Sequence, residues 1–462
     1  MINSQLNQKF GKINKNKLQI ILLAIYSVIL IIASEQFFFV NQGDFSRTIG
    51  NISSENSRFL QSWPLRDEFN TPKIFEIYSI FIWAIGLLSK LFTSDISIFI
   101  TSITQKIFLL LSALVIAKNI SSSKKIITVY YLLIATVMML PHNSGVFKSF
   151  YPESFFIIGI TLITGGLINN KPDSNNLIIL LGTILCGLAK VQYFYIPLLV
   201  TITFIFLYHK DNPPKFKSTI VYLVFIQIFC LAPLIKNEYA QVNRYHALYL
   251  GAYMAMESDD LIKHKITPDK VQCIGVDAWG NKLSGQSGII VEPNHKTCFG
   301  SNIISISDII HTYTESPKLF ISLLEKTFDS HFTTNYFHVY PDFKYLSKTS
   351  EKIRLIPGII NHLSNIRSNI PPHYIAFFLI TTLIILLSTS QCNTNEFHVY
   401  ILLLTIASSQ IAISLLGEGL RDLSKHLLGV QYIIDLLTTL LTIKILGLVF
   451  NRFYFLRRYD QS

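Results

Sequence analysis

The stretch KIFEIYSIFIWAIGLLSKLF, residues 73–92, decides how this chain is arranged in a membrane. It is long enough to cross a hydrocarbon core of about 30 Å, which needs about 20 apolar residues. A crossing here would place the lysine-rich loop 118–125 outside, although Lys and Arg favour cytoplasmic loops. Glu76, Lys90 and polarity on two sides suit a helix lying in the interface. We therefore predict an interfacial helix, with both chain ends in the cytoplasm.

The composition is that of a membrane protein. The 462-residue chain is 50% hydrophobic and 15% charged, whereas soluble domains carry about 25% charged residues. The first apolar run, 18–40, has no small-residue cleavage site, which indicates a retained span rather than a signal peptide. The net charge of +11 comes from basic residues between apolar runs. This is the positive-inside pattern, and it argues against a nucleic-acid partner.

These patterns predict an all-α polytopic protein of the bacterial cytoplasmic (inner) membrane, with about ten spans. The predicted spans are 18–40, 97–117, 126–141, 153–169, 176–189, 193–208, 218–236, 373–390, 397–416 and 428–450. The predicted parts are an N-terminal membrane module 1–236 with a first outer loop 41–96, an outer loop or lid domain 237–372, and a C-terminal membrane module 373–462.

The segment 237–372 is too long for a mere connection, so we expect it to fold as a domain or a lid. It contains Cys273 and Cys298, which can form a disulfide in an oxidising compartment or remain free thiols. No Walker motif, dinucleotide-binding GxGxxG in its strand–helix context or CxxC pair appears in the sequence. ATP-driven transport, dinucleotide chemistry and a thiol zinc site therefore have no support.

Two acids lie at the predicted outer boundary. Asp44 follows the first span in NQGDFSR, with Arg47 beside it. It is either an interfacial cap or a general base tuned by the neighbouring cation. Glu153 follows Tyr151 and Pro152 at the start of a span, where the helix dipole favours a carboxylate. That pattern also describes an ordinary helix start, so both interpretations stand.

Cations collect on the same side. Lys190 lies with Gln192 in a tight turn, where it either snorkels to the interface or binds an anion such as a lipid phosphate. Helical spacing would place four charged residues on one face, followed by His426: Glu418, Arg421, Asp422 and Lys425. This is either a salt-bridged helix end or a cluster for phosphate oxygens.

Two further ionisable residues, Lys106 and Asp435, fall inside predicted spans. Charged groups are costly in a bilayer and are usually functional there. Lys106 either snorkels outward or lines the same cavity as the outer cluster, and the sequence leaves both possibilities open.

This one-sided arrangement resembles the GT-C superfamily of membrane glycosyltransferases, whose members carry a catalytic acid in the first outer loop. The resemblance rests on segments 43–47 (GDFSR), 70–76 (NTPKIFE), 187–190 (GLAK), 245–251 (YHALYLG) and 417–426 (GEGLRDLSKH), together with Glu153. The last two segments look like features of a bacterial branch that decorates cell-surface polysaccharides. Asp44 has no adjacent second acid, so the sequence does not decide whether Mg²⁺ or Mn²⁺ takes part.

The resemblance implies an inverting transfer of a sugar from a polyprenyl-phosphate donor to a glycan acceptor, such as O-antigen, capsule or wall polysaccharide. It makes Asp44 the base and gives Glu153 an orienting or metal-binding role. Lys190, Arg421, Lys425 and His426 would neutralise the leaving phosphate. Supporting roles fall to Arg47, Tyr151, Gln192, Glu418 and Asp422. The segment 237–372 would close over the acceptor and exclude water.

Besides a receptor or assembly factor with no chemistry, two other functions fit a many-span protein with a large outer loop. One is an O-antigen or capsule polymerase, although 237–372 has only three arginines to hold a lipid diphosphate, Arg244, Arg354 and Arg367. The other is a lipid-linked-glycan flippase or transporter, although such proteins tend to show repeated halves and a midplane site. The polar residues here favour one face, and no repeat is evident.

Overall fold

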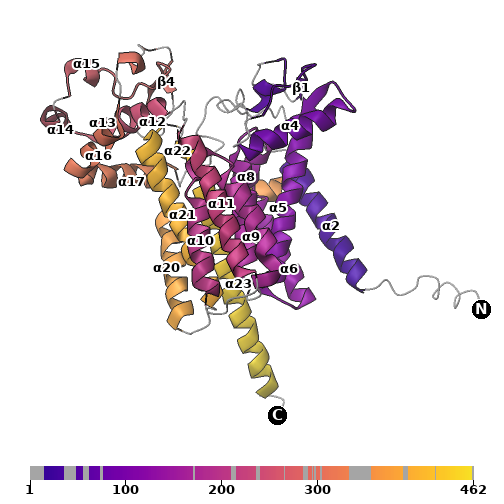
Figure 1. Ribbon diagram of the computed structural model, residues 1–462. Coiled ribbons are helices and arrows are strands. Elements are labelled where there is room, and N and C mark those ends of the chain that lie inside the picture. Colours follow the sequence, from indigo (N-terminus) through magenta and orange to yellow (C-terminus); the bar gives the residue numbers. More distant parts are fainter. Residues whose placement is uncertain are drawn as a thin grey trace, which may run out of the picture.

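A bundle of long apolar helices forms the body of the molecule, and short helices and strands gather at one end of it (Figure 1). The computed structural model describes residues 15–35, 48–55, 62–72, 76–169, 172–209, 215–235, 240–264, 266–284, 290–293, 295, 298–301, 304–331, 355–388, 394–421 and 423–459. Three of the predicted site residues, Asp44, Arg47 and Asp422, lie outside these described residues.

Six helical segments among the described residues are long and apolar enough to cross a membrane. They are α2 (Lys15–Ser34), α5 (Ile98–Ile120), η3 (Val191–Tyr193) continued by α10 (Ile196–Tyr208), α11 (Phe216–Ile235), α21 (Thr394–Glu418) and α23 (Leu428–Tyr459). A seventh span results if α6 (Lys124–Met138) is joined to its continuation across a 69° bend, formed by α7 (Pro141–Ser144) and η2 (Gly145–Lys148).

The predicted count of about ten spans is therefore not confirmed. Every predicted segment does contain a helix, but three of the helices are short: α8 (Glu153–Leu167), α9 (Pro172–Gly187) and α20 (Pro372–Ser388). The 15 residues of α8 extend only about 22 Å, less than the hydrocarbon core. Each of these helices ends two residues before its predicted C-terminal end, so apolar character located the helices but did not decide whether helices this short cross the membrane.

α8 is the central helix of the bundle, because every one of its residues except Leu162 is buried. It packs against α5 and α9. A Cβ atom added at Gly159 would lie 2.6 Å from the carbonyl oxygen of Gly182, so these two backbones touch. Small residues allow such close contact between helices in membranes. The packing therefore fixes the N-terminus of α8, where Glu153 lies.

The segment 73–92 forms α4 (Ile77–Lys90), a helix of 14 residues that is too short to span by itself. The Ile77 N–H donates to the carbonyl of Leu188 at 3.0 Å, and the Tyr78 hydroxyl donates to the carbonyl of Ser149 at 3.1 Å. α4 thus contacts the turns that precede α8 and η3, at the end of the bundle where β1 also lies (Figure 1). A helix of this length agrees with the prediction that 73–92 does not span, and its place in the interface stays a prediction.

Short elements flank α4. η1 (Ile49–Asn51) precedes β1 (Ser62–Pro64), which pairs antiparallel with β2 (Asp95–Ser97). Trp63 of β1 is buried against Phe150, with ring centroids 5.0 Å apart. This small sheet therefore packs on the turn that leads to α8.

Most of segment 237–372 gathers over the end of α21 (Figure 1). Its elements are α12 (Ala240–Ala247), a π-helical turn η4 (Leu248–Ala252), α13 (Tyr253–Ala255), α14 (Ser258–Lys263), α15 (Pro268–Val271), β3 (Lys282–Leu283), β4 (Ile290–Glu292), η5 (Phe299–Ser301), α16 (Ile306–Glu315) and α17 (Pro317–His331). β3 and β4 pair antiparallel. Cys273 and Cys298 are joined by a disulfide.

The last helix of this segment lies elsewhere. α19 (Leu355–Ser368) packs against α2 and α7, two elements of the N-terminal membrane module. Segment 237–372 therefore contacts the bundle at two separate places, once over α21 and once beside α2.

Candidate functional site

A buried ion pair joins two of the predicted site residues at the N-terminus of α8. Lys190 Nζ donates to Glu153 Oε1 at 3.1 Å, and the Glu153 side chain is 1% exposed. Lys190 precedes η3, and Glu153 is the first residue of α8. Lys190 thus binds a carboxylate rather than snorkelling alone. The second oxygen of Glu153, Oε2, is buried without a hydrogen-bond partner among the described residues.

Two neighbours of this pair also present unpartnered polar atoms. Gln192 Nε2 and Tyr193 Oη are buried and make no hydrogen bond of good geometry among the described residues, although the two side chains are near enough to interact with each other. The Tyr193 ring stacks on Phe156 in the first turn of α8, with centroids 4.5 Å apart. A buried polar atom without a hydrogen-bond partner lowers the stability of the folded protein. Each of these atoms is therefore expected to have a partner that the described residues do not supply.

A second pair lies where α21 ends. His426 Nε2 is 2.7 Å from Glu418 Oε2, and His426 belongs to α22 (Leu423–His426). Lys190 and His246 are near enough to Glu418 for a Coulombic interaction, so the two pairs are neighbours. His426 Nδ1 is buried without a hydrogen-bond partner among the described residues. It accepts a hydrogen bond when the ring is neutral and donates one when the ring is protonated.

Lys425 joins the same region through an aromatic contact. Its Nζ lies 4.7 Å from the centroid of Tyr151, two residues before Glu153. The Lys425 residue is 7% exposed. A cation over a ring is attracted by the negative face of the π-system. This contact places Lys425 beside the turn that leads into α8. It agrees with the prediction that cations collect on the side of the molecule that holds Glu153.

The predicted single face of Glu418, Arg421, Asp422 and Lys425 is wrong. α21 ends at Glu418, and Gly419 has a φ of +61°. A residue in this left-handed conformation ends a helix, so the spacing of 3.6 residues per turn does not continue through this segment. Lys425 then belongs to the separate short helix α22.

Arg421 points to a different partner. Its Nη2 is 3.3 Å from Asp277 Oδ2, and its guanidinium lies 5.6 Å from the Trp279 ring. Asp277 is fully buried and accepts from the backbone N–H groups of Trp279 and Asn281. Arg421 therefore ties the turn after α21 to the segment bridged by the disulfide.

Two glycines let these segments meet. The Leu420 N–H donates to the carbonyl of Leu250 at 2.8 Å, which joins the turn after α21 to the π-helical turn η4. A Cβ atom at Gly419 would lie 2.6 Å from the nitrogen of Gly251. Both the positive φ and the close approach therefore require glycine at position 419.

We expect Gly419→Ala to lower the free energy of unfolding by about 1–3 kcal/mol, because alanine is strained at this φ and collides with backbone. Thermal unfolding of the purified protein in detergent measures this. The matched control is Gly300→Ala, since a Cβ atom there meets nothing within 4 Å. Equal melting temperatures for the two variants would contradict the expectation.

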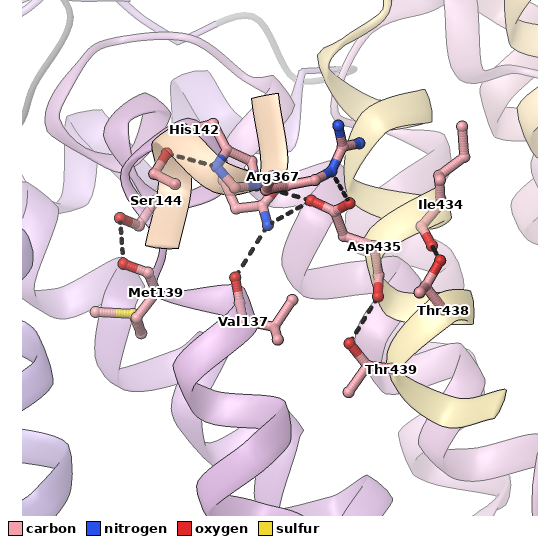
Figure 2. Close-up of polar contacts among 11 residues, drawn as sticks. Val137, Met139, His142, Ser144, Arg367, Ile434, Asp435, Thr438 and Thr439 are labelled. Carbon is pink, nitrogen blue, oxygen red and sulfur yellow. Dashed lines mark hydrogen bonds and ion pairs between the residues drawn. The ribbon is translucent and has the colours of Figure 1, made fainter. Parts of the chain in front are cut away.

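A separate buried network surrounds Asp435 of α23 (Figure 2). Asp435 Oδ1 accepts from Arg367 Nε at 2.6 Å. Asp435 Oδ2 lies 2.8 Å from His142 Nε2 and accepts from Asn143 Nδ2 at 3.1 Å. The other ring nitrogen of His142 is 2.8 Å from Ser364 Oγ. The network thus joins α7, α19 and α23.

The sequence singled out Asp435 as an intramembrane acid but did not identify its partners. Arg367 is 68 positions away along the chain and His142 is 293. The one available signal was that a buried acid requires a cation. The network fixes the turn that leads to Tyr151 and Glu153, so it positions the candidate site without containing it.

A third network accounts for Lys106. Its Nζ donates to Glu35 Oε1 at 2.7 Å, and Lys148 Nζ lies 3.3 Å from Glu35 Oε2. Ser102 Oγ also donates to Glu35 Oε1 at 2.6 Å, so two ammonium groups and a hydroxyl contact this buried carboxylate. Lys106 is fully buried and therefore does not snorkel outward. This network ties α5 and η2 to the end of α2.

No group of three or more His, Cys, Asp and Glu residues within the described ranges could hold a metal ion. Asp44 lies outside those ranges. A role for Mg²⁺ or Mn²⁺ therefore stays an open expectation.

Comparisons with known proteins extend over almost the whole chain. The model of the family described as YfdI N-terminal transmembrane domain matches residues 4–458. The chain is also similar to "Uncharacterized protein YfdI" of Escherichia coli (strain K12), with 25% identity over 436 residues, which cover 91% of this chain and 94% of that protein. No solved structure matches the chain. The match includes both helical modules and the segment between them.

Proposed function

The chain belongs to the family of the YfdI N-terminal transmembrane domain, and we propose that this membrane protein is an inverting glycosyltransferase, a hexosyltransferase of the bacterial inner membrane. It would move a sugar from a polyprenyl-phosphate donor to a cell-surface glycan on the extracytoplasmic face. The observation that carries the proposal is the buried Glu153–Lys190 pair, whose Glu153 Oε2 has no hydrogen-bond partner among the described residues. A buried carboxylate oxygen that lacks a protein partner is available to a bound ligand, and such oxygens are typical of functional sites.

In the proposed reaction, the oxygen of an acceptor hydroxyl forms a bond to the anomeric carbon while the bond from that carbon to the phosphate oxygen breaks. The bonding electrons leave with the phosphate, and the hydroxyl proton passes to a base. We assign the base to Asp44, which lies outside the described residues. Glu153, held by Lys190, would orient sugar hydroxyls through its Oε2 atom.

Negative charge grows on the phosphate as the bond breaks, so cations near it lower the barrier. We assign this role to Lys190, Lys425 and His426, which the two ion pairs and the Tyr151 contact bring to one region. Arg421 is held by Asp277, so we assign it to fastening the disulfide-bridged segment beside the site. Closure of that segment would exclude water and protect the activated sugar from hydrolysis.

Mass analysis of the surface glycan tests the proposal. A deletion strain is compared with the same strain carrying the wild-type protein and with one carrying Lys190→Met. We expect the wild type alone to add one hexose to each acceptor unit. Unchanged glycan masses in all three strains would contradict a transferase. A change only in the length of the polymer would favour a polymerase instead.

A further inference from the structure

An apolar cavity of about 640 Å³ lies where the disulfide-bridged segment meets the membrane bundle. Its walls come from α12, α16 and the outer ends of α11 and α21, represented by Leu234 and Leu416. Small-molecule sites have volumes of about 300–1,000 Å³ and are mostly apolar. Because α11 and α21 are candidate membrane spans, the cavity lies at the boundary of the bilayer.

One wall is an amphipathic helix face. Ile306, Ile309, Ile310 and Tyr313 of α16 line the cavity at positions i, i+3, i+4 and i+7. This spacing places all four side chains on one stripe of the helix. Ile306 and Ile310 are each 57% exposed, an unfavourable arrangement in water. An apolar chain entering from the outer leaflet would cover them.

Arg244 of α12 is the one charged side chain among the described residues that line the cavity. It forms no ion pair with another described residue, while its guanidinium matches the oxygens of a phosphate in charge and geometry. A guanidinium in an otherwise apolar wall fits a ligand with an anionic head and an apolar tail.

The cavity and the candidate site share two chain segments. Gly417 lines the cavity and directly precedes Glu418, which pairs with His426. Arg244 and His246 both belong to α12, and His246 is near enough to Glu418 for a Coulombic interaction. Side chains two positions apart point to different sides of a helix, so α12 presents Arg244 to the cavity and His246 to the candidate site.

We propose that this cavity binds the isoprenoid chain of a lipid monophosphate, with Arg244 at the phosphate. The isoprenoid identity rests on the proposed function, whereas the match to an apolar chain with an anionic head rests on the cavity itself. The bound lipid would present its phosphate and sugar to the Glu153–Lys190 pair from the membrane side.

Binding of farnesyl phosphate to the purified protein in nanodiscs tests this without any transfer reaction. We expect Arg244→Gln to weaken binding about tenfold or more, since a hydrogen bond to a charged group contributes about 1.5–3 kcal/mol. Ile310→Glu should weaken it similarly by placing a carboxylate in the cavity. Ile321→Glu on α17 is the matched control, because Ile321 is 56% exposed and does not line the cavity.

Wild-type affinity in both cavity variants would overturn the proposal even if sugar transfer had been demonstrated. Weaker binding in both variants but not in the control would support it even if no transfer occurred. Dodecyl phosphate, which has a straight chain, distinguishes the source of the lipid. Equal competition by dodecyl phosphate would overturn the isoprenoid assignment, and clearly weaker competition would support it.

Discussion

Glu153→Gln is expected to lower the rate of sugar transfer about 100-fold or more per molecule of folded protein. Glutamine keeps the shape of the side chain and still accepts a hydrogen bond from Lys190, but it lacks the charge. The side chain is 1% exposed, so water cannot replace the lost carboxylate. The measurement is transfer from a polyprenyl-phosphate hexose to the acceptor glycan in vesicles that contain the purified variant.

The chain offers a matched control at the opposite end of α21. Glu396 pairs with Lys444 at 2.7 Å and is also an acid in the first turn of an apolar helix. α21 has 25 residues, so Glu396 lies about 35 Å from the Glu418 end. Glu396→Gln should therefore leave transfer unchanged. A normal rate in Glu153→Gln vesicles would remove Glu153 from the reaction.

Asp435→Asn should lower the free energy of unfolding by about 3–5 kcal/mol, because it leaves the guanidinium of Arg367 in a buried site without its counterion. The side chains of Arg367 and Asp435 are only 15% and 7% exposed. The change also weakens the contact of Asp435 with His142 of α7, whose other ring nitrogen contacts Ser364 of α19. Unfolding of the purified protein in mixed detergent micelles measures the effect.

The double variant Asp435→Asn with Arg367→Met serves as the control. It removes both charges, so it should recover part of the stability lost in the single variant. A single-variant cost below about 1 kcal/mol would indicate that the pair is well solvated. Such a result would contradict the description of this network as a buried anchor for α19.

Helix positions followed from the sequence because hydrophobicity is a local property. Each of the ten predicted segments contains a helix, and 73–92 contains the short helix α4 beside the turn that precedes η3. Whether a helix crosses the membrane was less accessible, since α8 and α9 end within two residues of their predicted C-terminal ends and yet are shorter than a span requires. Gly419 follows an apolar run, and a glycine in that position usually marks the end of a helix. The predicted charged face requires the helix to continue past Gly419, which is why that prediction is wrong.

The sequence by itself determined which residues were chemically unusual. Glu153, Lys190, His426 and Asp435 stood out because ionisable groups near apolar runs are costly and need a reason. Only the tertiary structure decided their partners. Glu153 pairs with a lysine 37 positions away and Asp435 with a histidine 293 positions away. Such pairing depends on how helices pack against each other, which no local pattern of residues records.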